Sequence, residues 1–101
     1  MVVLIFNVAK EKITTKTKMV VIQRSCGYMM RPSLSVDEIG EICKFVKEIN
    51  PNCICYIDNC YGEFTDTKEP IEVGADIIAG SLIKNPGGGI APTGGYIVGR
   101  K

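Results

Sequence analysis

Histidine is absent from this 101-residue sequence, and so is tryptophan. Without an imidazole the chain cannot build a Ser-His-Asp triad, a Cys-His nucleophile pair or a histidine-ligated metal site. Long apolar runs are also missing, since no stretch approaches the ~18 apolar residues that a membrane-spanning helix needs. The 12 basic and 11 acidic residues leave a net charge of +1, and the basic residues form no long block. We therefore expect no membrane partner and no nucleic acid partner.

Five cysteines are present, and no recognisable secretory signal precedes them. The opening apolar run, residues 2–6, has no basic segment ahead of it and is interrupted by Asn7. These features are typical of a reduced, cytoplasmic protein. Cys53 and Cys55 lack the CxxC spacing of a metal-ligand pair, so we expect thiols that pack as small apolar core residues and no metal site. A thiol-based metal or redox module that also uses Cys60 is the weaker alternative.

Helical and strand patterns alternate along the chain, which favours an α/β fold with a mostly parallel sheet. The clearest element is a helix that begins after Ser35, because Glu38 completes a capping box and apolar residues then recur at three- and four-residue steps. Asn50-Pro51 ends that helix. Continuous apolar runs predict strands that are covered on both faces. The other expected elements are a helix over 8–15 capped by Asn7, strands over 19–22, 53–57, 76–80 and 95–99, and a short helix over 69–74.

Polar residues follow the expected strands, at the end of a parallel sheet where ligands bind. Arg24 and Ser25 follow the first strand, Asp58 ends the second, and Ser81 and Lys84 follow the third. Lys84 stands among apolar residues and glycines, where an ammonium loses proton affinity and can become a nucleophile that forms a Schiff base. An ordinary solvated loop lysine explains Lys84 equally well, and Asp58 taken alone is more simply explained as a cap.

Considered together, three of these residues match what a pyridoxal phosphate enzyme requires of its protein. Such enzymes need a Schiff-base lysine, an acid against the pyridinium nitrogen and donors for the phosphate. Lys84, Asp58 and Ser81 can supply these groups in that order. The glycine run 87–89 does not fit a nucleotide-binding P-loop, because the lysine precedes the glycines. These three residues are therefore compatible with pyridoxal 5'-phosphate as a cofactor, which the family resemblance described next implies.

Longer stretches carry a family resemblance, namely residues 57–64, 72–76 and 80–96, extended upstream by 22–25 and 31–34. Over about residues 8–101 the chain resembles the bacterial methionine gamma-lyase-like family, also labelled aluminium resistance proteins. That family is similar to the cystathionine-metabolism branch of fold-type-I pyridoxal phosphate enzymes.

The resemblance implies a carbon–sulfur lyase with a small amino-acid substrate and a homo-oligomeric assembly. It also implies that Lys84 is the catalytic Schiff-base lysine, that Asp58 is the pyridinium partner and that Ser81 contacts the cofactor phosphate. Tyr61 and Glu63 fall on the side expected to face the substrate, and the resemblance assigns them no role.

The chain also departs from the family pattern. Members are several times longer, with a glycine-rich phosphate turn and a ring-stacking aromatic upstream and a small domain downstream. Cys26 and Met30 stand where an arginine and a tryptophan are expected. We therefore expect residues 1–101 to form an incomplete, central portion of a pyridoxal phosphate-dependent transferase-like large domain, with an atypical N-terminus over 1–7. Such a chain would not catalyse the reaction alone; the alternative is a non-catalytic remnant that folds with a complementing chain.

Overall fold

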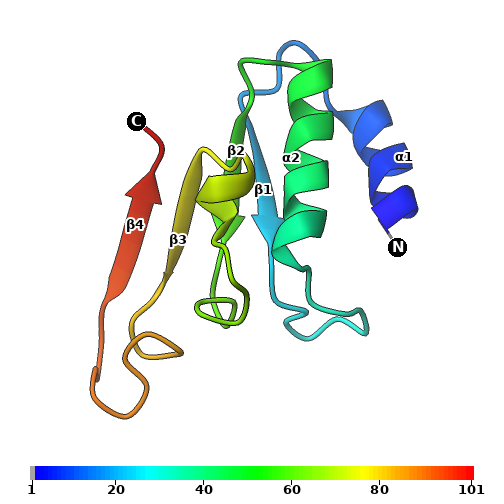
Figure 1. Cartoon of the computed structure of the whole chain (residues 1–101). Helices are drawn as coiled ribbons and strands as arrows, with labels where there is room; N and C mark the ends of the chain where they lie inside the picture. Colours follow the sequence, from blue (N-terminus) through cyan, green and yellow to red (C-terminus); the bar gives the residue numbers. More distant parts are fainter. Residues whose placement is uncertain (1) are drawn as a thin grey trace.

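A four-stranded sheet organises the chain, as shown by a computed structural model that describes the backbone of residues 2–101 and the side chains of residues 6–101 (Figure 1). The strands lie in the order β1-β2-β3-β4. The first three are parallel, and β4 runs antiparallel to β3. This arrangement confirms the α/β class and the mostly parallel sheet. The elements are α1 (Val2–Lys12), β1 (Met19–Gln23), α2 (Val36–Ile49), β2 (Ile54–Asp58), η1 (Pro70–Val73), β3 (Ile77–Ser81) and β4 (Gly95–Gly99).

Helix α2 begins at the predicted capping box. The Ser35 hydroxyl accepts a bond from the Glu38 N–H at 3.1 Å, and the Glu38 carboxylate accepts one from the Ser35 N–H at 2.8 Å. Its apolar face, which includes Ile39 and Val46, is buried in the core beside the strands. The helix ends at Asn50, as the following proline predicted.

Helix α1 differs from the prediction. The expected helix over 8–15 was to be capped by Asn7, whereas the structure places Asn7 inside α1. Phe6, the last residue of the apolar run before Asn7, packs on α2, where its ring centroid lies 4.7 Å from that of Phe45. Met1, part of the atypical N-terminus, lies outside the described residues. No helix within residues 2–101 has the length and apolar content needed to cross a membrane.

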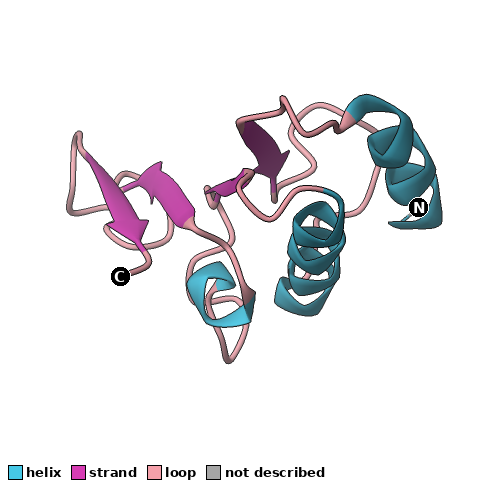
Figure 2. Cartoon of the chain, turned by 90° about the horizontal axis from the view of Figure 1, so that it is seen from above, coloured by secondary structure: helices cyan, strands magenta, loops and turns pink. Residues whose placement is uncertain are grey.

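Helices cover only one face of the sheet. Figure 2 shows α2 and η1 on one side, and no described helix lies over the opposite side. Cys55 and Ile57 point to the helices and are fully buried. On the opposite face Met19 and Ile54 are exposed, and Val21 is 62% exposed. The strands are apolar enough to need cover on both faces, and among the described residues helices cover only one of them.

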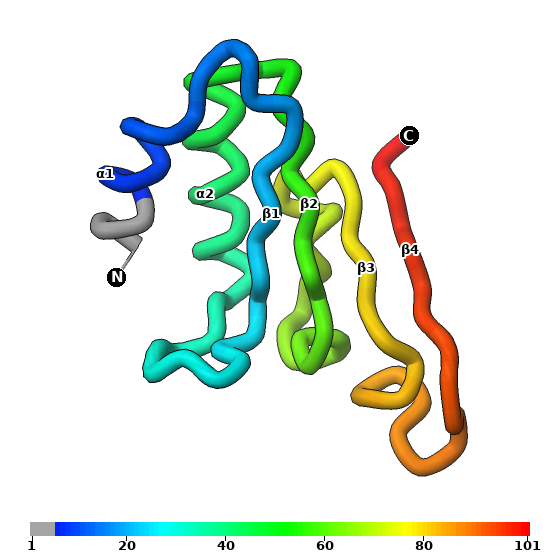
Figure 3. The backbone as a smooth tube through the Cα atoms, turned by 180° about the vertical axis from the view of Figure 1, so that it is seen from behind, coloured from blue at the N-terminus to red at the C-terminus, as the bar shows by residue number. Residues whose placement is uncertain are grey.

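The loops that follow β1, β2 and β3 lie at one end of the sheet, because the three strands are parallel (Figure 3). Residues 59–65, here called the acid loop, follow β2, and residues 82–94, the lysine loop, follow β3. Asp58 pairs with Ala79, two residues before Ser81, so Asp58 and Ser81 share the open face of the sheet. The fold thus gathers the predicted site residues at one edge.

Candidate functional site

A pocket of about 530 Å³ opens beside the carboxyl end of β2, and Lys84 and Asp58 both line it. Its volume falls within the ~300–1,000 Å³ that is usual for small-molecule sites. The structure therefore brings together the lysine and the acid that the sequence singled out, although Asp58 ends β2 and Lys84 lies in the loop after β3. The rest of the wall is made by Gln23, Ser25, Cys26, Gly27, Tyr28, Ser33, Cys60 and Tyr61.

Asp58 is the last residue of β2 and is half-buried. Its Oδ1 accepts a hydrogen bond from the Cys60 N–H at 3.2 Å, which caps the turn that leaves the strand. No hydrogen bond from the described residues reaches its other oxygen, Oδ2. The capping role and a ligand-facing role are therefore compatible, because each uses a different oxygen of the carboxylate.

Lys84 holds its ammonium against the acid loop. The Nζ atom lies 4.6 Å from the centroid of the Tyr61 ring, within cation–π range. A hydrogen bond with the Cys60 thiol, aided by the charge of Asp58, raises the pKa of Lys84 above its ordinary value, and its slight burial is too weak to lower it. The expectation of reduced proton affinity is therefore wrong for this structure. The loop leaves Lys84 half-exposed among polar partners, so the amine must lose a proton before it can attack an aldehyde.

Ser81 lies at the end of β3 and makes a local contact. Its Oγ accepts a hydrogen bond from the Ile83 N–H at 3.3 Å, at the start of the lysine loop. Ser81 is not among the residues that line the pocket of Lys84 and Asp58. Its contact with a cofactor phosphate therefore stays a prediction.

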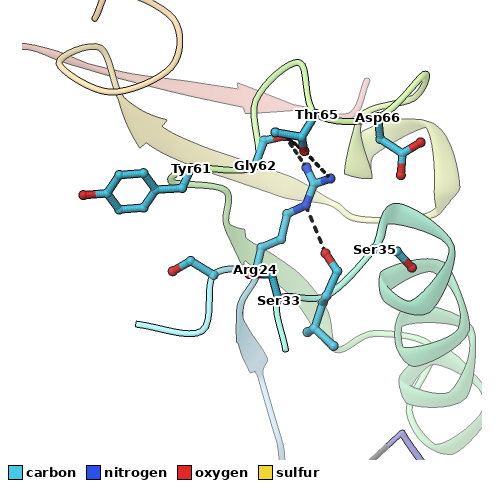
Figure 4. Close-up of a pocket in the computed structure, with 9 residues that line it drawn as sticks. Arg24, Ser33, Ser35, Tyr61, Gly62, Thr65 and Asp66 are labelled. Carbon is cyan, nitrogen blue, oxygen red and sulfur yellow. Dashed lines mark hydrogen bonds between the residues drawn. The ribbon is translucent and has the colours of Figure 1, made fainter. Parts of the chain in front are cut away.

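Arg24 is a buried clamp between loops, with 3% of its surface exposed. Its Nη1 donates to Asn59 Oδ1 at 2.9 Å and to the Gly62 carbonyl at 2.8 Å, and its Nε donates to the Leu34 carbonyl at 3.2 Å. Figure 4 shows the guanidinium directed at Gly62 and Thr65. With its donors engaged in this way, Arg24 shapes the acid loop and does not present its charge to a ligand.

A buried polar network lies on the helix side of the sheet, behind the pocket. Glu63 is 4% exposed, and its Oε1 accepts a hydrogen bond from the Tyr96 hydroxyl at 2.7 Å. Burial and the Glu63 carboxylate raise the pKa of Tyr96 well above its ordinary range. Gly80 makes room for the pair, because a Cβ there would lie 2.4 Å from Glu63 Oε1. Tyr61 therefore lines the pocket, as its sequence position suggested, but Glu63 does not.

A second pocket, of about 350 Å³, adjoins the first (Figure 4). Ser25, Ser33 and Tyr61 line both pockets, so the two cavities share a wall. Sequence reasoning named Ser25 but missed the contribution of Gly27, Tyr28 and Ser33 to the wall of the Lys84 pocket, because their loop has no hydrophobic periodicity. The sequence feature that could have identified this loop is its position directly after a predicted strand, where Arg24 and Ser25 lie.

The three buried cysteines pack in the hydrophobic core. Cys53 and Cys55 are fully buried beside Cys43 of α2, which confirms their prediction as small apolar core residues. A hydrogen bond with Cys55, together with burial, raises the pKa of Cys43 far above that of a free thiol. Within residues 6–101 no group of three or more Cys, Asp or Glu side chains is arranged to hold a metal ion.

The family described as methionine gamma-lyase matches residues 3–101. Over 95 residues the chain is 58% identical to YnbB of Bacillus subtilis (strain 168), a protein of uncharacterised function; this alignment covers 94% of the chain and 23% of YnbB. A protein from Listeria monocytogenes, provisionally named a cystathionine beta-lyase involved in aluminium resistance, has a crystal structure and is 61% identical in sequence. The two structures superpose with a TM-score of 0.90 over 95% of this chain and 24% of that one.

A carbon-sulfur lyase involved in aluminium resistance from Clostridium novyi NT is 54% identical, with a TM-score of 0.80 over 98% of this chain and 22% of that chain. The fold is also shared at 21% identity with metB from Corynebacterium glutamicum, at a TM-score of 0.71. The chain thus spans about a quarter of the length of these relatives. Because the family match covers residues 3–101, the chain belongs to the methionine gamma-lyase family.

Proposed function

We propose that this chain supplies the lysine-and-acid part of a pyridoxal phosphate site in a carbon–sulfur lyase that acts on a small amino acid. The observation that carries the proposal is that Lys84 and Asp58 line one pocket of about 530 Å³. The names of the Listeria and Clostridium relatives support the reaction class.

The residues present fit the cofactor. A pyridinium N–H needs a carboxylate oxygen, and Oδ2 of Asp58 receives no hydrogen bond from the described residues. The amine of Lys84 lines the same cavity and is the group that condenses with an aldehyde, with loss of water. Bound there, pyridoxal phosphate would supply an electron sink for a carbanion formed on the substrate.

The protein's own contribution is to hold and move protons. Asp58 would keep a proton on the ring nitrogen by pairing with it. Lys84, once displaced by the amine of the substrate, would accept a proton from the α carbon as a general base. The raised pKa keeps the Lys84 amine protonated at neutral pH, so its neutral fraction grows only as the pH becomes alkaline, and we expect adduct formation to accelerate there.

The test is to mix the chain with pyridoxal phosphate and record the yellow absorbance of the bound group, then reduce with borohydride and locate the modified lysine by mass spectrometry. Lys84→Ala should abolish both signals. Lys68→Ala, at an exposed loop lysine, is the matched control and should leave both unchanged. Absence of colour and of a modified Lys84 in the unaltered chain would refute the proposal.

A second candidate, a non-catalytic chain that needs a complementing chain or a second copy, is favoured by the open sheet face. Val21 is 62% exposed and Ile97 is 79% exposed on that face, where apolar side chains would gain from cover. Co-expression with the remaining segments of a full-length relative tests this candidate. Lyase activity in the mixture and in neither part alone supports it, whereas a monomeric chain that is active by itself argues against it.

A further inference from the structure

We propose that Asn85 sets the position of Lys84 relative to Asp58 by tying the lysine loop to the acid loop. Asn85 is a positioning residue in this proposal, since it acts through its neighbours and does not line the Lys84 pocket. The purpose of the positioning rests on the proposed function, whereas the tie itself is a feature of the fold.

The tie consists of two hydrogen bonds from one side chain. Nδ2 of Asn85 donates to the Tyr61 carbonyl and to the Glu63 carbonyl, each at 3.0 Å. Within residues 6–101 these are the only hydrogen bonds that join the lysine loop to the backbone of the acid loop, and Lys84 itself hydrogen-bonds with the Cys60 thiol. The residue that makes them is the immediate chain neighbour of Lys84.

The acid loop has a shape that needs such support. Tyr61 and Phe64 have φ angles of 66° and 62°, in the left-handed region that residues other than glycine rarely adopt. Strained conformations of this kind persist only where the surroundings hold them. The carbonyl between the two Asn85 acceptors, that of Gly62, is held by Arg24 at 2.8 Å. Three successive carbonyls of the loop are thus held by donors from outside it.

Asn85 and Lys84 engage the same residue from two sides. Asn85 holds the Tyr61 carbonyl, while the ammonium of Lys84 lies 4.6 Å from the centre of the Tyr61 ring. On the other side of the turn Asp58 caps the N–H of Cys60, the residue before Tyr61. A series of contacts therefore connects Asp58, through the acid loop, with the side chains of Asn85 and Lys84.

Few other hydrogen bonds among the described residues hold the lysine loop in position. The Leu82 N–H donates to the Gly94 carbonyl at 3.0 Å, which closes the base of the loop next to β4. Beyond that base the chain is rich in glycine, with three in succession at 87–89, and Gly89 has a φ of 82°. Without Asn85 no hydrogen bond within the described residues would link the Lys84 side of this loop to the backbone of the acid loop.

The experiment compares Asn85→Leu, which keeps the side-chain volume and removes both donors, with Asn52→Leu at an exposed asparagine outside the site. The first readout needs no cofactor. Lysines are labelled with ¹³C-methyl groups, the Lys84 signal is assigned with Lys84→Arg, and its chemical shift and titration are followed by NMR. In Asn85→Leu we expect loss of the shift caused by the Tyr61 ring and a lower pKa of Lys84, whereas Asn52→Leu should match the unaltered chain.

The second readout is the affinity for pyridoxal phosphate. We expect Asn85→Leu to weaken it about fivefold or more, since one exposed and one part-buried hydrogen bond each contribute at least the low end of the usual range. Far-UV circular dichroism checks the fold, and Asn85→Ala takes the place of Asn85→Leu if the latter unfolds.

Three outcomes separate the two proposals. A Lys84 signal that is the same in the unaltered chain and in the Asn85 variant overturns the positioning role. An equal change in Asn52→Leu overturns it as well. If the unaltered chain binds no pyridoxal phosphate but the Asn85 variant shifts the Lys84 signal, the tie stands and only the proposed function fails.

Discussion

Replacement of Arg24 by methionine tests whether this buried residue holds the site in shape. Arg24→Met keeps much of the length of the side chain but removes the donors that reach Asn59, Gly62 and Leu34. Leaving a buried acceptor without its donor costs about 1–3 kcal/mol, and Arg24→Met does this to three neutral acceptors. A domain of this size has about 5–15 kcal/mol in total. We therefore expect Arg24→Met to lose a large part of the free energy of unfolding.

The assay is urea unfolding at pH 7, followed by far-UV circular dichroism. Arg100→Met is the matched control, because its guanidinium is 58% exposed and pairs only with Asp76. Exposed pairs of this kind contribute about 0–1 kcal/mol, so the control should stay close to the unaltered chain. The difference in the free energy of unfolding between the two variants then measures how much the buried contacts of Arg24 stabilise the fold.

Two results would refute this reasoning. A loss below about 1 kcal/mol in Arg24→Met would show that the buried contacts are not a clamp. Full stability combined with loss of the pyridoxal phosphate adduct would show that Arg24 contacts the ligand itself, which its geometry in this structure argues against.

Two further predictions concern acid stability and thiol reactivity. Burial alone would raise the pKa of Asp76, but the Cys55 N–H at 2.8 Å and the Lys47 ammonium at 2.7 Å outweigh it and hold that pKa below 3.8. The stabilisation by ionised Asp76 is therefore complete above about pH 4 and is lost as the pH falls through the lower folded-state pKa. Asp76→Asn should flatten the curve of thermal stability against pH below about pH 4, and an unchanged slope there would contradict this prediction. Iodoacetamide should modify the half-exposed Cys26 and Cys60 in the native chain and the three buried cysteines only in urea, as read by peptide mass spectrometry. Pyridoxal phosphate should slow the labelling of Cys60, which lines the Lys84 pocket, and equal rates with and without it would count against the site.

Local patterns predicted most of the elements. The capping box and the apolar spacing placed α2, the short apolar runs placed the strands to within a residue, and Pro70 marked the start of η1. These features depend on residues close together in the chain, where capping and periodicity act. The failure at α1 has the opposite cause, because Phe6 joins that helix by packing on Phe45, far along the sequence.

The sequence by itself determined the α/β class, the family and the two residues proposed to hold the cofactor, since their order and spacing are properties of the chain. Only the tertiary structure decided how Lys84 is held. The two residues before it in sequence are apolar, but its neighbours in space are Cys60, Tyr61 and Asp58, so its pKa rises where the sequence predicted a fall. The electrostatic environment of a side chain depends on the groups that surround it in space, and parallel strands bring those groups together from distant parts of the chain.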